Sequence, residues 1–549
     1  MPKLNRLAAV AVLSSTLAAC AAGTRPPTDK PADAHFTLLQ VNDTYKIEGL
    51  EGGSKGGFAR LRTLRKQLEA GGRKVLVLHG GDILFPSVMS KYLRAQPVVK
   101  ILNGLDGDPA AFDPYLIATF GNHEFDDRDP GVLLGRVAQS DFDWVTANVY
   151  YRSIPQAGGE PLSKRLTHVH ETLVRELDGV KVGVFGLTTD VNDRDYVRYD
   201  YEGDARRVVV RKSLDSLKEQ GAQVVIALTH QDLADDEKLA AEFPDIDLIV
   251  GGHEHFHIQK RVGRTWITKA DADNQSAVVY DVTVRPGQPL EATPRKIDLD
   301  AGTEKDAALQ AEVEKYRAQL NATVKQQTGR DAGEVVGRAV NLLEGIETAV
   351  RGRETALGNF LADTIRTRMK TDVAFTNGGG IRINDNILPG PITSLDLEGL
   401  FYFDNQLVAG EVTGAELLDI LNNAVSKVHL GDGRFLQVSG LRFEYRNVGN
   451  EDAPRFTVAA EDVGIRPQGS RDFRPLDLTR RYTVGTTDFI WDSGYKDGYV
   501  LFAKGKGETS PPLIAREPVS FRRAVEEAIG RLPDKTVTTA IEGRIRRVE

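Results

Sequence analysis

The sequence contains a single cysteine, Cys20, so no disulfide bond can form within the chain. It also lacks a basic excess, because Lys and Arg number 70 against 78 Asp and Glu, and the net charge is −8. This balance argues against a nucleic-acid polymer as partner, since such proteins use excess cations to replace phosphate counterions. Hydrophobic residues make up 41% and charged residues 27% of the chain, which argues against a disordered or polytopic membrane protein. The 549 residues leave room for two to four domains.

The N-terminus has the pattern of an export signal. Two basic residues precede a mainly apolar run at 7–19, which is too short to cross a bilayer of about 30 Å as a helix. The run ends in Leu-Ala-Ala-Cys, which resembles a bacterial lipobox with Cys20 as the acylated residue. A plain signal peptide with an incidental cysteine is the alternative, but the only cysteine lies where a lipobox requires it. We therefore expect a signal peptide at 1–19, a lipidated tether at 20–34, and an exported lipoprotein anchored at the periplasmic or outer-membrane face.

Short aliphatic or β-branched runs alternate with amphipathic stretches through the first half of the sequence, which is typical of an α/β fold. The runs that predict buried strands are 36–41, 75–79, 115–120, 144–147, 182–187, 224–229 and 247–250. Amphipathic helices are predicted at 58–68 and 205–219.

A stripe of apolar residues predicts one long helix in the middle of the chain. Leu309, Val313, Tyr316 and Leu320 follow one another at intervals of three or four residues. We interpret 301–333 as a connector helix between a first domain at 35–300 and a second, mixed α/β domain at 334–549.

Polar residues follow five of the predicted strands directly. They are Asp43, Asp82, Asn122, His230, His253 and His255. Because ligands bind at the carboxyl ends of strands in α/β sheets, we expect these side chains at one edge. One Asp or His after a strand is usually a turn or cap residue, but five such elements favour a shared site. Carboxylate, amide and imidazole groups suit two divalent cations such as Mn, Zn, Fe or Mg, which together can activate water against a phosphoryl group.

Four motifs carry a resemblance to a known family. Gly-Gly-Asp at 80–82, Gly-Asn-His-Glu-Phe-Asp at 121–126, Thr-His at 229–230 and Gly-Gly-His-Glu-His at 251–255 resemble those of calcineurin-like metallophosphoesterases. Together with motifs in the second domain, they make the chain similar to the 5′-nucleotidase family. The resemblance implies an N-terminal four-layer αββα sandwich, a connector helix and a mixed α/β substrate-binding domain.

The resemblance also implies roles for the strand-end residues. Asp82 would bridge two metals, Asn122, His230 and His253 would complete one site, and Asp43 and His255 would complete the other. His123 and Asp126 resemble a catalytic dyad, in which the imidazole stabilises the transferring phosphoryl group. The physics agrees, because a cation aimed at developing negative charge dominates phosphoryl transfer.

The first motif departs from the family pattern. The family has Asp-x-His, with both residues as ligands, whereas this chain has Asp43-Thr44-Tyr45. An ordinary tyrosine has a pKa of about 10 and is a poor ligand unless it ionises. We expect a weaker or different first metal, or one completed by Glu48 or water, with the Tyr45 phenol hydrogen-bonded to Asp43 or to water.

The second domain carries candidate substrate-binding residues. By resemblance they are Arg353, Asn377, Arg382, Phe403, Phe489 and Asp497. The arginines can hold phosphate oxygens in bidentate fashion, and the glycines at 378–380 allow backbone N–H groups to approach an anion. The two phenylalanines would stack on a nucleobase, and Asp497 would lie near the ribose. A surface arginine could instead be a solvated charge, and either phenylalanine could belong to the core.

These observations predict a secreted phosphohydrolase that releases phosphate from nucleotides through a metal-bound hydroxide. A cyclic-nucleotide phosphodiesterase or a nucleotide-sugar hydrolase is an alternative on the same scaffold. A non-catalytic, nucleotide-binding surface lipoprotein is a third, if Tyr45 marks a decayed site. The presence of both His123 and Asp126 favours catalysis, because a pure binding protein has no need of that pair.

Overall fold

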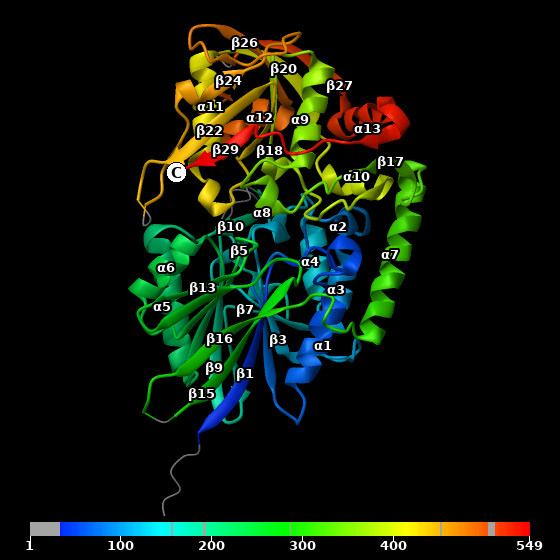
Figure 1. Ribbon diagram of the computed structural model, residues 1–549. Helices are drawn as coiled ribbons and strands as arrows, with labels where there is room; N and C mark the ends of the chain where they lie inside the picture. The colour runs from blue at the N-terminus through cyan, green and yellow to red at the C-terminus, as the bar shows by residue number, and fades with distance from the viewer. Residues whose placement is uncertain (1–32, 155–157, 190–193, 286, 451–452, 503–510) are drawn as a thin grey trace, which may run out of the picture.

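Two β-sheets stacked face to face form the centre of the N-terminal half of the molecule. The computed structural model describes residues 33–154, 158–189, 194–285, 287–450, 453–502 and 511–549, so Cys20 and the predicted signal peptide lie outside the described residues. The N-terminal half comprises the elements up to β16 and the C-terminal half those from β17 onward. Helix α7 (Ala307–Thr328) runs along one side and joins the two halves (Figure 1).

The first sheet has the strand order β16-β15-β1-β2-β3-β4-β7. Its strands are β1 (Ala34–Val41), β2 (Val75–His79), β3 (Asp113–Thr119), β4 (Phe142–Val145), β7 (Val169–His170), β15 (Ser276–Val284) and β16 (Glu291–Asp298). Neighbours from β1 to β7 are parallel, whereas β15 is antiparallel to both β1 and β16.

The second sheet has the strand order β13-β14-β12-β11-β9-β8. Its strands are β8 (Thr172–Leu177), β9 (Val180–Thr188), β11 (Val224–His230), β12 (Leu248–Gly252), β13 (Ile258–Val262) and β14 (Thr265–Lys269). The central four are parallel, and β8 and β13 pair antiparallel at the edges. A small separate sheet contains β5 (Val149–Tyr151), β6 (Glu160–Pro161) and β10 (Val197–Tyr199).

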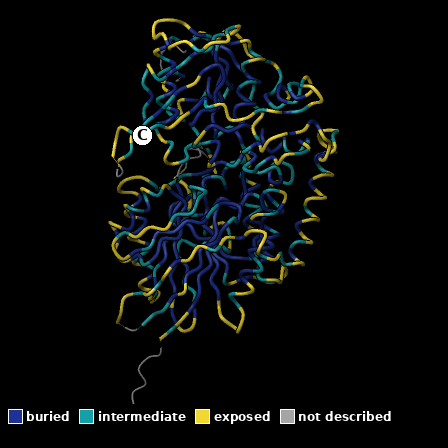
Figure 2. Tube along the Cα trace, in the orientation of Figure 1, coloured by how far each residue is buried: buried dark blue, intermediate teal, exposed yellow. Residues whose placement is uncertain are grey.

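Helices cover the outer face of each sheet. Leu38 and Leu76 of the first sheet pack against Val184 and Ile226 of the second, whereas Leu39 points to the opposite face. The outer face of the first sheet is covered by α1 (Phe58–Leu68), α3 (Gln96–Asn103) and α4 (Pro130–Ala138), and that of the second by α5 (Gly203–Glu219) and α6 (Leu233–Glu242). The central strands are therefore buried on both faces, which explains their continuous apolar runs. Figure 2 shows this half with dark blue, buried traces at its centre, whereas the edge strands β13 and β16 are mostly exposed. The predicted four-layer sandwich is confirmed.

The connector helix packs against the N-terminal half along its length. Leu309, Val313, Leu320 and Val324 are buried against α1, α3 and α2 (Val88–Leu93). The helix begins where the Asp306 carboxylate accepts hydrogen bonds from two backbone N–H groups, and it ends at Gly329 with a φ of 73°. The predicted stripe is confirmed except that Tyr316 is only partly buried.

The described residues of the C-terminal half form three sheets, with strand orders β21-β18-β26-β20-β27, β23-β22-β24-β25 with β29 beside β22, and β19-β17-β28. The strands are β17 (Val335–Ala339), β18 (Val373–Asn377), β19 (Gly390–Thr393), β20 (Gln406–Thr413), β21 (Leu436–Ser439), β22 (Leu441–Asn447), β23 (Phe456–Thr457), β24 (Val463–Ile465), β25 (Arg474–Pro475), β26 (Arg481–Thr487), β27 (Leu513–Ser520), β28 (Thr536–Val537) and β29 (Ile545–Val548). The helices are α8 (Glu347–Val350), α9 (Ala356–Met369), α10 (Ser394–Leu400), α11 (Gly414–Ser426), α12 (Asp488–Ser493) and α13 (Phe521–Arg531).

The predicted strands and helices of the first half are all present, with ends that shift by no more than two residues. The exact domain boundaries stay a prediction. Among the described residues, none of the helices combines the length and apolar character that a membrane span requires.

Candidate active site

The strand-end residues come from both sheets. Asp43, Asp82 and Asn122 follow β1, β2 and β3 of the first sheet, His230 is the last residue of β11, and His253 and His255 follow β12 of the second. The stacking of the sheets brings these strand ends together at one rim, and their assignment to one functional site stays a prediction.

Four of these residues have a backbone that most amino acids avoid. The φ angles are 52° at Asp43, 57° at Asp82, 95° at His253 and 62° at His255. Such left-handed conformations cost free energy and gather at functional sites, where the surrounding structure enforces them. A side chain at position 121 would collide with Asp82, because a Cβ there would lie 2.1 Å from Oδ1 of Asp82. This close approach requires glycine.

One group of donor atoms gathers around Asp82, Asn122, His230 and His253. Nε2 of His230 lies 3.2 Å from Oδ2 of Asp82 and 3.1 Å from Oδ1 of Asn122. Nδ1 of His253 lies 3.3 Å from the same Nε2. Three residue types that bind divalent cations therefore present ligand atoms to one small volume.

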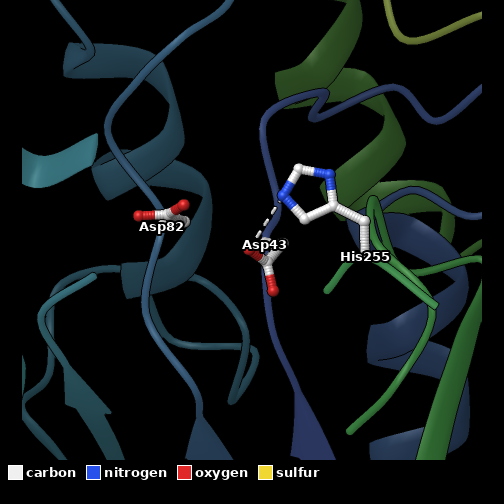
Figure 3. Close-up of side chains that lie close together, drawn as sticks. All are labelled: Asp43, Asp82 and His255. Atoms are coloured by element: carbon white, nitrogen blue, oxygen red, sulfur yellow. Dashed lines mark ion pairs between the residues drawn. The ribbon is translucent and has the colours of Figure 1, made fainter. Parts of the chain in front are cut away.

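A second group comprises Asp43, Asp82 and His255, which approach one another from separate loops (Figure 3). One ligand atom from each lies within 4.8 Å of the others, and Nε2 of His255 is 3.2 Å from Oδ1 of Asp43. Both carboxylates are fully buried and acidic, so a cation would offset their charge. The two groups share Asp82 and fit a pair of divalent cations.

Tyr45 lies inside the second group. Its phenol oxygen is 2.9 Å from Oδ2 of Asp82, 3.1 Å from Nε2 of His255 and 3.4 Å from Oδ1 of Asp43. We expected a contact with Asp43 or with water, but the phenol also contacts two further donor atoms directly. Burial, with Asp82 and Asp43 close by, raises the pKa of Tyr45 well above its ordinary value, so the phenol is protonated while the site holds no cation.

Opposite charges shift the pKa values of the metal-free site. Burial alone would lower the pKa of His230, but Asp82 and Asp43 outweigh it and raise this pKa to about 9. Burial alone would raise the pKa of Asp43, but His255 and His230 outweigh it and lower this pKa to about 2. In the absence of metal, a proton on His230 therefore compensates part of the buried negative charge.

His123 and Asp126 form the predicted pair. Nδ1 of His123 lies 2.8 Å from Oδ2 of Asp126, and both side chains remain partly accessible. The backbone N–H of His123 donates to Oδ1 of Asp82 over 2.9 Å. This hydrogen bond fixes the imidazole beside the candidate metal ligands.

Glu124 has a structural role that the sequence analysis missed. Its buried carboxylate accepts hydrogen bonds from the backbone N–H groups of Asp82 and Leu84, each over 3.0 Å, and from Ile83 and Gly121. Burial and the neighbouring Asp82 raise the pKa of Glu124 to about 7. The Gly-Asn-His-Glu motif contained the only signal in the sequence, because three of these four N–H groups belong to the loop of Asp82.

A cleft of about 590 Å³ lies between the halves of the molecule. Asn122, His123 and His253 line its N-terminal side. The predicted residues that line its C-terminal side are Asn377, Arg382, Phe403, Phe489 and Asp497. Five of the six predicted substrate residues thus face the candidate metal groups.

The two phenylalanines differ in their surroundings. Phe403 is 41% exposed and lies under the guanidinium of Arg382, whose carbon is 5.4 Å from the ring centre, so it is not a core residue. Phe489 packs partly on the core of the C-terminal half and also lines the cleft. Both rings are available to a flat ligand.

Arg353 is the one predicted substrate residue that does not line the cleft. Its guanidinium forms two 2.8 Å hydrogen bonds with the carboxylate of Glu344, its side chain is 55% exposed, and it is not among the cleft-lining residues. Arg351 lines the cleft in its place. The two arginines are separated by Gly352 at the end of α8, and the turn there points only the first toward the cleft.

Comparisons with known proteins identify the family of the chain. Residues 36–257 match the calcineurin-like phosphoesterase family, and 335–504 match the 5′-nucleotidase C-terminal domain. The chain is 26% identical to snake venom 5′-nucleotidase of Naja atra, over 87% of this chain and 91% of that protein. It is also 26% identical, over 95% of its length, to the trifunctional nucleotide phosphoesterase protein YfkN of Bacillus subtilis (strain 168), of which it spans 35%. The crystal structure of a 5′-nucleotidase precursor from Thermus thermophilus has a TM-score of 0.74 and 26% identity, covering 94% of this chain and 99% of that one.

The first match defines a metallophosphoesterase, a hydrolase that acts on phosphoric ester bonds and uses divalent metals. With the second match and the shared fold, the chain belongs to the 5′-nucleotidase family. The predicted family, fold and enzyme class are confirmed.

We expect metal affinity to depend on pH through His230. Its raised pKa of about 9 means that, below that pH, a cation must displace a proton, and so Mn²⁺ binding should weaken by up to about tenfold per pH unit between 8 and 6. Calorimetry in buffers with different protonation heats would count the released proton. His35→Asn, at an exposed strand end, is the control and should retain the same dependence. A pH-independent Mn²⁺ affinity over this range would contradict the expectation.

We expect Tyr45→His to tighten Mn²⁺ binding at the Asp43–Asp82–His255 group, because imidazole supplies a neutral nitrogen ligand where the phenol carries a proton. Tyr45→Phe should change affinity modestly, unless the phenol itself is a ligand, in which case the loss is severe. Mn²⁺ titrations of metal-free protein would measure both variants. Tyr316→His, on α7, is the matched control. Two equally tight sites in the wild type, unmoved by either substitution at Tyr45, would show that this residue does not set the affinity.

Proposed function

We propose that this protein is a nucleotide phosphohydrolase that releases phosphate from nucleoside monophosphates or related esters. The observation that supports it most is a single cleft with candidate metal ligands on one side and exposed aromatic and arginine side chains on the other. This arrangement suits a molecule with an anionic group at one end and a flat base at the other. The names of the relatives support a nucleotide as substrate.

We assign the metal ligands as the two groups that share Asp82. Asp82, Asn122, His230 and His253 hold one cation, and Asp43, Asp82 and His255 hold the other. When bound, the two cations supply Lewis acidity toward a phosphoryl oxygen and lower the pKa of water. The chain's own task is to fix these donors, which the left-handed loops and the Glu124 hydrogen bonds accomplish before substrate arrives.

His123 is the proposed group that meets the transferring phosphoryl oxygen or the leaving oxygen. Asp126 holds Nδ1 of this imidazole, which leaves Nε2 to face the cleft and donate a hydrogen bond or a proton. Fixed donors of this kind stabilise charge that develops in the transition state.

The C-terminal half supplies the proposed substrate contacts. Arg351 and Arg382 bind phosphate oxygens, and Asn377 offers a buried Oδ1 with no partner among the described residues. Phe403 and Phe489 stack on the base, which tolerates several bases because every base presents an aromatic face. Asp497 accepts hydrogen bonds from the ribose hydroxyls.

The two alternatives differ in what they require of the site. A phosphodiesterase or nucleotide-sugar hydrolase would use the same residues, and the name of the trifunctional relative supports testing such substrates. A non-catalytic nucleotide-binding protein has no use for the His123–Asp126 pair, whose 2.8 Å contact is intact.

We also propose the domain and export assignments made from the sequence. A metallophosphoesterase domain spans 35–300, a connector helix 301–333 and a substrate-binding domain 334–549. A signal peptide at 1–19 and an acylated Cys20 would place the protein at a membrane surface after export.

We expect His123→Ala to lower kcat for AMP by roughly 100-fold or more, because one transition-state donor is lost. Bound Mn²⁺ should not change, since His123 is not in either donor group. Asp82→Asn should instead reduce both bound metal and activity, because it removes the shared charge. Steady-state hydrolysis of AMP, UDP-glucose and a cyclic nucleotide with Mn²⁺, before and after chelation, measures the effects and separates the alternatives.

The matched control is His257→Ala, a nearby histidine that is not among the residues lining the cleft. It should retain near wild-type kcat. Full activity of His123→Ala with intact metal would show that the dyad assignment is wrong. Binding of AMP with no hydrolysis of any of these substrates would favour the non-catalytic alternative.

We expect Cys20→Ser to abolish incorporation of labelled palmitate and to release the protein from membranes or leave its signal peptide uncleaved. Stable anchoring takes more than one acyl chain, so partial acylation would leave only marginal binding. Labelling of cells that produce either form measures this. Ser15→Ala, within the predicted signal peptide, is the control. Equal labelling of wild type and Cys20→Ser would contradict the lipoprotein assignment.

A further inference from the structure

Glu347, the first residue of α8, connects a candidate metal ligand with two arginines of the C-terminal half. It belongs to the C-terminal half and is only 6% exposed. Its Oε2 forms an ion pair with Nδ1 of His255, which belongs to the N-terminal half. Its Oε1 forms an ion pair with Nη2 of Arg351 and lies 3.8 Å from Nη1 of Arg382. One buried carboxylate therefore contacts both the metal side and the substrate side of the site.

The two ring nitrogens of His255 face different partners. Nε2 lies 3.2 Å from Oδ1 of Asp43 and points into the second donor group, while Nδ1 faces Glu347. A carboxylate beside Nδ1 favours the proton on that nitrogen and leaves the lone pair on Nε2 for a cation. Glu347 thus selects the tautomer that can act as a ligand.

The position of Glu347 depends on how the two halves dock. Oδ1 of Asn384 accepts from the backbone N–H of Glu347 over 3.2 Å, and Nδ2 of Asn384 donates to Oδ2 of Asp273 over 2.8 Å. Oδ1 of Asp273 in turn accepts 2.8 Å hydrogen bonds from the backbone N–H groups of Tyr45 and Lys46. This chain of contacts holds α8 in register with the loop that carries Asp43. It consists of polar contacts, which are weaker constraints on domain position than a large apolar interface.

We propose that Glu347 is a positioning residue that completes the Asp43–Asp82–His255 site only when the two halves are docked. The inference rests on the proposed metal sites. When a phosphate anion pairs with Arg351 and Arg382, these arginines interact less strongly with the Glu347 carboxylate. That carboxylate then interacts more strongly with the imidazole of His255. Phosphate and the cation of this site are therefore linked, and each tightens binding of the other by the same factor.

The first test measures Mn²⁺ binding to metal-free protein without any substrate. Glu347→Ala should weaken one of the two Mn²⁺ sites by about 10–100-fold and leave the other unchanged, as loss of a carboxylate behind a ligating histidine does. Glu347→Gln keeps the volume but not the charge and should weaken the same site by a smaller factor. Glu344→Gln is the matched control, because its carboxylate pairs with Arg353, which does not line the cleft. It should bind both Mn²⁺ ions as the wild type does.

The second test measures the affinity for inorganic phosphate, which is not turned over, with and without Mn²⁺. The wild type and Glu344→Gln should bind phosphate more tightly in the presence of Mn²⁺. In Glu347→Gln, the ratio of the phosphate affinities with and without Mn²⁺ should fall most of the way to one. A purely structural role would not produce this effect in a folded protein.

A folded Glu347→Gln protein that binds both Mn²⁺ ions at wild-type affinity and keeps the phosphate ratio overturns the proposal. If Glu347→Ala does not fold, Glu347→Gln alone decides. Neither measurement needs turnover, so a failure here is distinct from a failure to hydrolyse AMP. A wild-type protein that binds no Mn²⁺ would overturn this proposal and the proposed metal sites together.

Discussion

The carboxylate of Asp82 faces both donor groups, with one oxygen 3.2 Å from His230 and 2.9 Å from the phenol of Tyr45. It is 1% exposed, so its charge is scarcely solvated by water and must be compensated by its neighbours. Asp43 and Glu124 are also buried acids, and Glu124 holds the loop of Asp82 through backbone N–H groups. The burial of these three acids explains why the surrounding structure is so constrained. Cations or protons have to be present, and the loops have to bring them close.

Much of the metal side could be predicted because it is local in sequence. Each donor follows a strand with an unmistakable apolar pattern, and parallel strands in stacked sheets bring their carboxyl ends together. The role of Glu124 was not predicted because its hydrogen-bond partners are backbone N–H groups, which a pattern of side chains does not reveal. The contact of Glu347 with His255 was not predicted because the two residues belong to different halves of the chain.

On the substrate side, Arg353 shows how a predicted residue can lie away from the cleft. Arg351 and Arg353 are the same residue type two positions apart, so composition cannot distinguish them. Which of the two arginines lines the cleft depends on the direction of the turn at Gly352 and on Glu344, which forms an ion pair with Arg353 at the surface. Phe403 was ambiguous for a similar reason, since the residue type favours the core, whereas its neighbours expose it. Tyr45 lies between these cases: the sequence revealed the departure, but only the structure shows the phenol among three donor atoms.

The left-handed backbone at Asp43, Asp82, His253 and His255 restricts which sequences can evolve at this site. Asp, Asn and His adopt positive φ more readily than most residues, and Asp and His are also the residue types that bind hard or intermediate cations. A β-branched or bulky replacement there would strain the loop as well as remove a candidate metal ligand. Tyr45 has no positive φ, so its position can accept an aromatic side chain without backbone strain. A substitution that changes the metal chemistry is therefore tolerated more easily at a position with an ordinary backbone than at these four.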